Sequence, residues 1–313
     1  MSRLFRFPSG LGVPNLTRPH SEYRPFPRYC VYVSYFAGRA VVVTGAGAGI
    51  GQQLSVKLAR QGALLSLIDR DRSSLRETMN IIGVQNNSHL ISNIDVTDRA
   101  AMNACAVETS EKFGGIDAVF NNAGILYSGD ILDSQFPDIE HVMNVNFWGV
   151  VNGSKAFLPF IIRSDRGHVI NMSSAFGLMA APGYAAYNAA KFAVRGFTES
   201  LRQEMLISHP QVRVTCVFPG GVKTSIARSA RMADALDRML VIESFEKNIA
   251  RTEPEIAASL ILRGVERGRS RILVGKDARL IDVVTRISSA GYQRILPALN
   301  SSRSGRSTGR SSL

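Results

Sequence analysis

Cysteine, tryptophan and long hydrophobic runs are scarce in this sequence of 313 residues, which contains three cysteines and one tryptophan. Cys30, Cys105 and Cys216 lie far apart, so their spacing fits neither a zinc site nor a redox motif. A sparse, odd set of cysteines favours reduced thiols and a cytoplasmic location. No apolar run approaches the ~18–20 residues that cross a bilayer, and no apolar segment near the start has the form of a secretion signal.

Positive charge is concentrated at the two ends of the chain. Of the net charge of +12, residues 1–36 contribute +4 and residues 298–313 contribute +3. The remaining excess is modest and suits an enzyme that attracts anionic cofactors. The serine- and arginine-rich tail has a disordered composition, and we expect it to have no nucleic-acid partner. Prolines throughout residues 1–36 break any long amphipathic helix, which predicts a disordered extension or a start codon assigned too early.

A glycine-rich turn joins the first β-branched run to a helical pattern. Residues 39–44 predict a buried strand, and apolar residues at helical spacing follow the turn. Glycines allow close approach to a pyrophosphate, and a helix N-terminus offers free N–H groups to it. The strand–turn–helix context therefore predicts a dinucleotide site. Its candidate residues are Gly45, Ala48, Gly49, Ile50 and Gly51.

An acidic residue ends the next predicted strand, residues 63–68. Asp69 lies 18 residues after Gly51, where an acid hydrogen-bonds the adenosine ribose and repels a 2′-phosphate. This favours NAD. Arg70 could instead pair with such a phosphate, so NADP remains the alternative. A second interpretation makes Asp69 an ordinary strand-end acid that caps the next helix.

Strand and helix patterns alternate along the rest of the chain, and 45% of the residues are hydrophobic. This alternation predicts an α/β fold, a doubly wound parallel sheet with helices on both faces in a single domain. The further predicted strands cover residues 116–120, 167–172, 212–217 and 271–274.

Tyr187 and Lys191 lie four residues apart in a helical pattern, which puts both on one face of the helix. A free tyrosine has a pKa of about 10. We expect the nearby ammonium, together with a positive nicotinamide, to lower this pKa and make the phenol a proton donor. Tyr184 is the other nearby phenol, but it lies seven residues before Lys191.

Three motifs in this order, at residues 44–51, 121–124 and 187–191, give the chain a family resemblance. Residues from about 37 to 275 resemble a short-chain dehydrogenase/reductase of the compact single-domain type. The resemblance implies a Rossmann-like fold and NAD(P)-dependent interconversion of a secondary alcohol and a ketone. It also implies a homodimer or homotetramer. It selects Tyr187 as general acid/base and has Lys191 bind the nicotinamide ribose as well.

The same resemblance assigns two further catalytic roles. Ser174, thirteen residues before Tyr187, would hold the substrate oxygen, with Ser173 as the adjacent alternative. Asn146 would support a water-mediated proton relay behind the lysine. The alternative for Asn146 is an amide that is hydrogen-bonded locally or exposed to solvent.

The resemblance also assigns cofactor contacts at several strand ends. Asp95 and Val96 would face the adenine. Asn122, Ala123 and Gly124 would line the cofactor cleft and help to hold the sheet. The residues near the nicotinamide would be Pro219, Gly220, Val222 and Thr224.

Apolar residues dominate the loops expected to border the substrate, which predicts a hydrophobic alcohol or ketone as the small-molecule partner. The alternative is that several of them are core or subunit contacts. Two other functions stay open, a ketoacyl-thioester reductase and a non-catalytic dinucleotide-binding sensor or scaffold. The bordering residues are Ile131, Leu132, Phe176, Leu178, Met179, Ile226, Met232, Leu236, Met239 and Leu240.

An amphipathic segment, residues 276–297, follows the domain assigned to residues 37–275 and precedes the tail at 298–313. A helix is predicted over residues 278–297. We expect this helix to cover the pocket or to pack against another subunit, rather than to bind a membrane. Its apolar face consists of Leu280, Val283, Val284 and Ile287.

Overall fold

Strands and helices alternate through residues 34–83 and 89–294, which are the residues that the computed structural model describes. The expectations for residues 1–33 and for the tail at 298–313 lie outside the described residues. The strands are β1 (Ala40–Thr44), β2 (Leu64–Asp69), β3 (Leu90–Asn93), β4 (Ala118–Asn121), β5 (Tyr127–Ser128), β6 (His168–Met172), β7 (Arg213–Pro219), β8 (Arg231–Met232) and β9 (Arg271–Val274).

Helices follow most of the strands. The α-helices are α1 (Gly49–Arg60), α2 (Arg72–Ile82), α3 (Arg99–Phe113), α4 (Phe136–Met143), α5 (Gly149–Ile161), α6 (Ala185–Ser208), α7 (Arg238–Asn248), α8 (Pro254–Glu266) and α9 (Lys276–Ser288). Shorter helical segments are the π-helix η1 (Asn144–Trp148) and the 3₁₀-helices η2 (Ala175–Gly177) and η3 (Ser289–Gly291).

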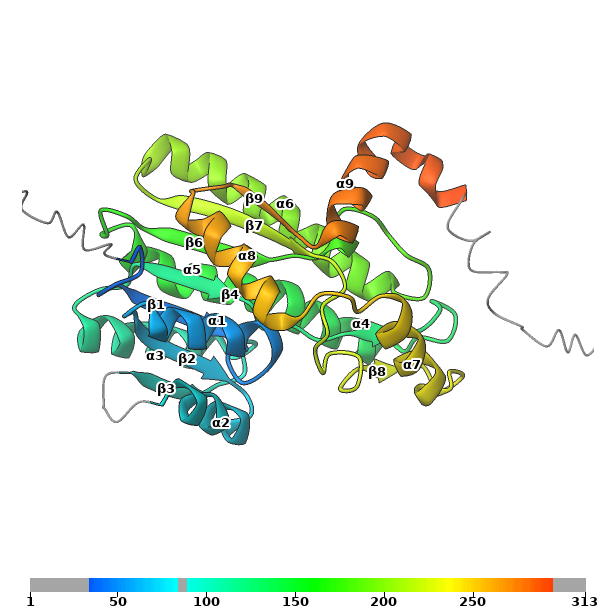
Figure 1. The fold of residues 1–313 in the computed structure, drawn as a ribbon, viewed down its shortest axis with the longest axis horizontal. Helices are drawn as coiled ribbons and strands as arrows, with labels where there is room; N and C mark the ends of the chain where they lie inside the picture. The colour runs from blue at the N-terminus through cyan, green and yellow to red at the C-terminus, as the bar shows by residue number, and fades with distance from the viewer. Residues whose placement is uncertain (1–33, 84–88, 295–313) are drawn as a thin grey trace, which may run out of the picture. The chain divides into compact units, whose positions relative to one another are not determined.

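The central sheet of the described residues contains seven strands in the order β3-β2-β1-β4-β6-β7-β9, and every pairing is parallel. The order runs outward in both directions from β1 and β4, so the chain crosses over between them. Ligands bind at such a switch point, outside the carboxyl ends of the strands. The predicted doubly wound parallel fold is confirmed (Figure 1).

Helices cover both faces of the sheet and bury a separate apolar layer on each (Figure 1). One layer contains Leu54 of α1 and Ile261 of α8, and the other contains Met102 of α3 and Phe157 of α5. Burial of each such large side chain stabilises the fold by about 1.5–3 kcal/mol. The two layers leave the carboxyl edge of the sheet free for a site.

Residues 136–161 are helical, but they do not form one α-helix. The π-helix η1 separates α4 from α5, and such wide turns occur often at functional sites. The described part of the predicted helix at residues 278–297 contains α9 and then η3, and residues 295–297 lie outside the described residues. Packed residues begin before residue 37, because the Phe36 side chain is fully buried in the core.

The apolar face predicted for α9 is largely open to solvent. The side chains of Leu280 and Ile287 are 64% and 82% exposed, and Val283 is 51% exposed. Within residues 34–83 and 89–294, none of the helices combines the length and the apolar character needed to cross a bilayer.

Candidate active site

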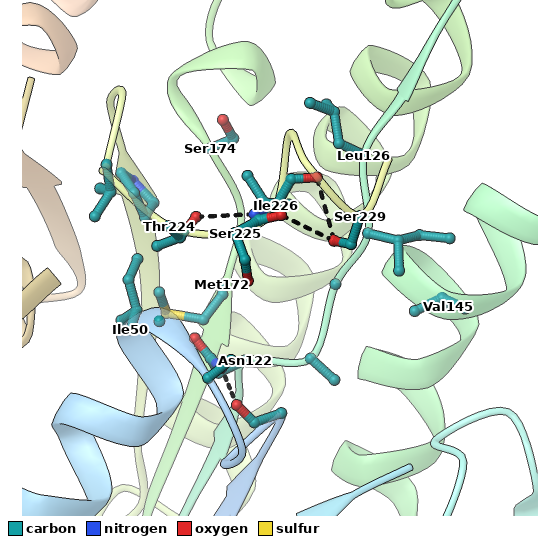
Figure 2. A pocket seen from close by; sticks show the side chains of 18 of the residues that line it. Ile50, Asn122, Leu126, Val145, Met172, Ser174, Thr224, Ser225, Ile226 and Ser229 are labelled. Carbon is teal, nitrogen blue, oxygen red and sulfur yellow. Dashed lines mark hydrogen bonds between the residues drawn. The ribbon is translucent and has the colours of Figure 1, made fainter. Parts of the chain in front are cut away.

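A cavity of about 430 Å³ opens at the carboxyl edge of the sheet, lined by the turns that follow β1, β2, β4, β6 and β7. Figure 2 shows Ile50 and Asn122 at one end of this cavity, and Ser174 and Leu126 at the other. The first end lies beside the glycine turn, and the second beside the start of α6. The strands thus bring residues from distant parts of the chain to one site.

The glycine positions of this turn have no room for a side chain. A Cβ on Gly45, whose φ is +65°, would lie 2.8 Å from the Cα of Ala123. A Cβ on Gly49 would lie 2.8 Å from the Thr224 side chain, and one on Gly51 would lie 2.0 Å from the Gly45 carbonyl oxygen. This close packing forms a backbone cradle at the start of α1 that fits a dinucleotide phosphate.

The Asp69 carboxylate is fixed beside this cradle. Its Oδ2 accepts a hydrogen bond from the Gly47 N–H at 2.9 Å, and its Oδ1 accepts one from the Asp71 N–H at 3.0 Å. The cap of α2 is Asp71, whose carboxylate accepts from two backbone N–H groups of that helix. The interpretation of Asp69 as the helix cap is therefore wrong. Arg70 lines the same end of the cavity and is exposed.

Helix α6 places Tyr187 and Lys191 in the cavity wall, where they are 8% and 4% exposed. The Lys191 ammonium donates a hydrogen bond to the carbonyl oxygen of Met172 at 3.0 Å. It lies 5.6 Å from the centroid of the Tyr187 ring. Tyr187 shares a hydrogen bond with the Ser174 hydroxyl. The three residues predicted to act together are therefore in one place.

Burial controls the protonation of this pair. It raises the pKa of Tyr187 to about 12, while the hydrogen bond with Ser174 lowers that pKa. Burial also lowers the pKa of Lys191 to about 8. In the protein without cofactor, loss of hydration outweighs the hydrogen bond with Ser174. The lowering of the Tyr187 pKa by Lys191 and a positive nicotinamide together stays a prediction.

The two serines after β6 differ in what their hydroxyls contact. Ser173 is buried and donates a hydrogen bond to the Lys191 carbonyl oxygen at 2.8 Å. Ser174 caps η2 by accepting from the Phe176 N–H at 3.1 Å, and it borders the cavity beside Tyr187. Of the two, Ser174 has the position that suits contact with a substrate oxygen.

Asn146 does not line the cavity but lies behind it, fully buried in η1. Its amide accepts from the Ile125 N–H and donates to the Ile125 carbonyl oxygen, both at 2.8 Å. A Cβ on Gly124 would lie 3.0 Å from the Asn146 Oδ1 and 3.4 Å from the Lys191 Nζ. The asparagine and the lysine are therefore neighbours across Gly124.

A buried amide network holds the centre of the sheet. Asn121 donates to Asn171 of β6 at 2.8 Å and to Ser154 of α5 at 3.1 Å. Asn122 donates to the Thr44 carbonyl oxygen at 3.0 Å, which fixes the glycine turn to the chain after β4. This region has a structural role in addition to lining the cavity.

Most residues predicted from the sequence for the cofactor lie in the cavity wall. Gly51 does not, because it packs beneath the glycine turn. The predicted residues that line the cavity are Gly45, Ala48, Gly49, Ile50, Asp69, Arg70, Asp95, Val96, Asn122, Ala123, Gly124, Ser174, Phe176, Tyr187, Lys191, Pro219, Gly220, Val222 and Thr224.

The predicted apolar border is mostly wrong. Phe176 and Ile226 line the cavity, but Leu132 is 94% exposed, and Leu178 packs in the core against Phe218. The other predicted border residues that lie outside the cavity wall are Ile131, Met179, Met232, Leu236, Met239 and Leu240.

Several residues of the wall were not predicted. Leu126, Phe245 and Ile249 provide apolar surface, and Asp277 and Ile281 of α9 reach the cavity from the C-terminal helix. No local signal marks Phe245 or Asp277, because both meet the cavity only through the fold.

Relatives of known family match most of the chain. A family model described as short chain dehydrogenase matches residues 39–235. SadH of Mycobacterium tuberculosis, named as a proposed oxidoreductase, is 48% identical over 269 residues, 85% of this chain and 96% of SadH. Dehydrogenase/reductase SDR family member 7B of Xenopus laevis is 35% identical over 252 residues, 77% of this chain and 75% of that protein.

A solved structure has the same architecture. The crystal structure of a short chain dehydrogenase/reductase from Burkholderia phymatum, in complex with NAD, superposes with a TM-score of 0.74 at 26% identity. The superposition covers 81% of this chain and 95% of that one. The family match includes Ser174, Tyr187 and Lys191 but ends before α9.

Proposed function

Because this chain belongs to the short-chain dehydrogenase/reductase family of NAD(P)-dependent oxidoreductases, we propose that it interconverts a hydrophobic secondary alcohol and a ketone. One observation carries the proposal. A backbone cradle for a dinucleotide lines the same cavity as a cluster of Ser174, Tyr187 and Lys191, of which Tyr187 and Lys191 are buried. A protein that only senses or scaffolds would not need a buried phenol beside a serine hydroxyl at the far end of a nucleotide site.

The residues of the cluster have complementary roles in this proposal. Ser174 holds the substrate oxygen, and Tyr187 takes the proton of an alcohol or returns it to a ketone. A bound nicotinamide cofactor supplies the chemistry of hydride transfer. Lys191 contributes positive charge near the phenol and a contact to the nicotinamide ribose, and its hydrogen bond to Met172 keeps it oriented.

Proton transfer requires a lower pKa of Tyr187 than the buried phenol has alone. Its pKa of about 12 keeps the proton on the phenol near neutral pH. A positive charge in the cavity would favour the phenolate, so we propose that oxidised cofactor and Lys191 together bring Tyr187 into its working range. Without cofactor, the phenol stays protonated.

We propose NAD as the preferred cofactor, with NADP less favoured. The Asp69 carboxylate is held by two backbone N–H groups at the end of the cavity next to the glycine turn. A fixed negative charge at this position accepts ribose hydroxyls and repels a 2′-phosphate. Arg70 is the residue that would offset this repulsion.

The substrate end of the cavity favours an apolar compound. Leu126, Phe176, Phe245 and Ile249 line it, and Tyr187 packs within the same apolar cluster. Such a wall offers few partners to the hydroxyls of a sugar, which would lose hydration on binding. We therefore place hydrophobic alcohols and ketones above polyols as substrates.

We also propose a homodimer or homotetramer formed through α5 and α6. Trp148, the last residue of η1 before α5, is 41% exposed, Phe192 of α6 is 39% exposed, and Leu206 of the same helix is 54% exposed. Light scattering of the purified protein measures the assembly, and a monomer would contradict this part of the proposal.

A substrate and cofactor panel tests the function. We expect the purified protein to oxidise apolar secondary alcohols, with a higher kcat/KM for NAD than for NADP. Activity restricted to sugars and polyols would contradict the substrate class. Preference for NADP with a ketoacyl thioester would favour a ketoacyl-thioester reductase, and tight cofactor binding with no turnover would favour a sensor.

A further inference from the structure

The first turn of α9 contacts the chain after β7 in the wall of the cavity. The Asp277 carboxylate accepts a hydrogen bond from the Gly221 N–H at 2.7 Å, across 56 residues of sequence. Both residues line the cavity. Asp277 lies beyond residues 39–235, the part of the chain matched by the family model.

The turn at residues 219–222 is packed tightly around this carboxylate. A Cβ on Gly220 would lie 2.1–2.3 Å from the Asp277 carboxylate atoms. A Cβ on Gly221 would lie 1.8 Å from the Ile249 carbonyl oxygen. The two glycines therefore fit between α9 and the end of α7, and neither position has space for a methyl group.

The other side of the same turn is also hydrogen-bonded. The Gly221 carbonyl oxygen accepts from the N–H groups of Arg251 and Thr252, both at 3.0 Å. Asp277 is the partner of the Gly221 N–H, so the residue is held on both its N–H and its carbonyl side. Hydrogen bonds to a charged group are stronger than those between neutral groups.

We propose that Asp277 is a positioning residue, which fixes the turn at residues 219–222 for the nicotinamide half of the cofactor. This inference rests on the proposed function, in which the turn lies beside the nicotinamide. The adenosine half would contact Asp69 and the part of the glycine turn at Gly47, whose N–H donates to the Asp69 carboxylate, and neither residue contacts Asp277. Loss of Asp277 should therefore weaken binding of the nicotinamide half of the cofactor and leave binding of the adenosine half unchanged.

Asp277 is not needed merely to hold α9 in place, because the helix has another anchor. Asp282, one turn and a half further along, pairs with Arg271 of β9 and with Arg286 of its own helix. Asp282 does not line the cavity. It is therefore the matched control for an effect of helix docking.

Calorimetric titration with two ligands separates the halves of the site. NADH reaches both halves, whereas ADP-ribose lacks the nicotinamide. We expect Asp277→Ala to weaken NADH binding about tenfold and ADP-ribose binding less than about twofold. Asp277→Asn keeps an oxygen that can accept from the Gly221 N–H, so it should restore most of the NADH affinity. Asp282→Asn should leave both affinities unchanged.

A second pair of variants tests the contact if Asp277→Ala is poorly folded. Gly220→Ala forces a methyl group against the carboxylate, and we expect it to weaken NADH binding in the same way as Asp277→Ala. The double variant removes the overlap, so the two effects should be clearly less than additive. Full additivity would overturn the inference.

Three results of the titrations would overturn it. Equal weakening of NADH and ADP-ribose by Asp277→Ala would show a general structural role. Unchanged NADH affinity would show no role, and equal effects of the Asp277 and Asp282 variants would assign the effect to helix docking. If the wild-type protein bound neither ADP-ribose nor a nicotinamide cofactor, the proposed function would fail as well.

Discussion

The Lys191 ammonium lies 5.6 Å from the centroid of the Tyr187 ring and donates a hydrogen bond to a main-chain carbonyl oxygen, that of Met172. Both side chains are nearly inaccessible to solvent. Burial favours the neutral form of each group. It raises the pKa of the phenol to about 12 and lowers the pKa of the amine to about 8. In the proposed function, a positively charged cofactor would be needed to bring the phenol into its working range.

Removal of the Tyr187 hydroxyl tests its assignment as proton carrier. We expect Tyr187→Phe to lower kcat at least about 100-fold, because general acid–base catalysis contributes roughly that much or more. NADH affinity, measured by fluorescence, should change little. Tyr184→Phe is the control, since Tyr184 lies one turn away and its hydroxyl hydrogen-bonds Ser128. A Tyr187→Phe variant with full turnover would contradict the mechanism.

The buried amine of Lys191 predicts a pH-dependent stability of the cofactor-free protein. The pKa of Lys191 is about 8 when folded and 10.5 when free. Below the folded pKa both states carry the proton, and the folded protein bears the whole penalty of burying the charge. Above it, only the unfolded state stays protonated, so the penalty is relieved as pH rises toward the free value.

Urea unfolding at several pH values gives the free energy of unfolding of the wild type and of Lys191→Met, and the contributions of other titrating groups cancel in the difference between them. We expect the free energy of unfolding of the wild type to rise by about 2 kcal/mol relative to that of the variant between about pH 7 and about pH 9.5. Titration of Tyr187 acts in the opposite direction, but only above pH 10, outside this range. A constant difference would mean that the folded amine keeps its proton.

The sheet and the glycine turn could be predicted from the sequence because their signals are local. Residues 39–44 form a β-branched run, and a buried strand needs little else to be recognised. The Tyr187–Lys191 pair could be predicted because helical spacing alone puts both residues on one face. The pKa of Tyr187 could not, since burial depends on the apolar cluster that distant segments form around the phenol.

Substitution of Asp69 should change the preference between NAD and NADP. We expect Asp69→Ser to shift the ratio of kcat/KM for NAD to that for NADP about tenfold toward NADP, because a repelling charge is lost near the ribose. Arg70 remains in place to pair with the 2′-phosphate.

The control for this variant is Asp71→Ser, which removes a neighbouring exposed carboxylate that also borders the cavity. Asp71 caps α2, and serine is an equally common N-cap residue, so this change should keep the helix and should not give the same shift in cofactor preference. Equal shifts in the two variants would point to general electrostatics and would contradict a specific contact of Asp69 with the ribose.

The cavity wall near the substrate was harder to predict than the cofactor end. In α7, Met239 and Leu240 are 73% and 63% exposed, whereas Phe245 of the same helix is buried against the cavity. The segment mixes apolar and charged residues with little helical periodicity, so only its packing decides which side chains face inward. Asp277 was missed for the same reason, because its partner Gly221 is 56 residues away.

We expect substitutions of the two asparagines in the π-helix η1 to differ in their effect on stability. Asn146 is fully buried and forms two hydrogen bonds with the backbone of Ile125, next to the cavity residue Leu126. Asn146→Ala leaves the N–H and the carbonyl of Ile125 without these partners. We expect a loss of about 2–4 kcal/mol and a fall in Tm of roughly 5 °C or more.

Asn144→Ala is the matched control, because Asn144 lies in the same π-helix and is exposed. Its Tm should stay close to that of the wild type, as measured by calorimetry without cofactor. If both variants lost the same stability, the effect would come from the helix itself and not from the amide. A larger loss of kcat in Asn146→Ala than its unfolded fraction explains would support the proton relay, since Asn146 neighbours Lys191 across Gly124.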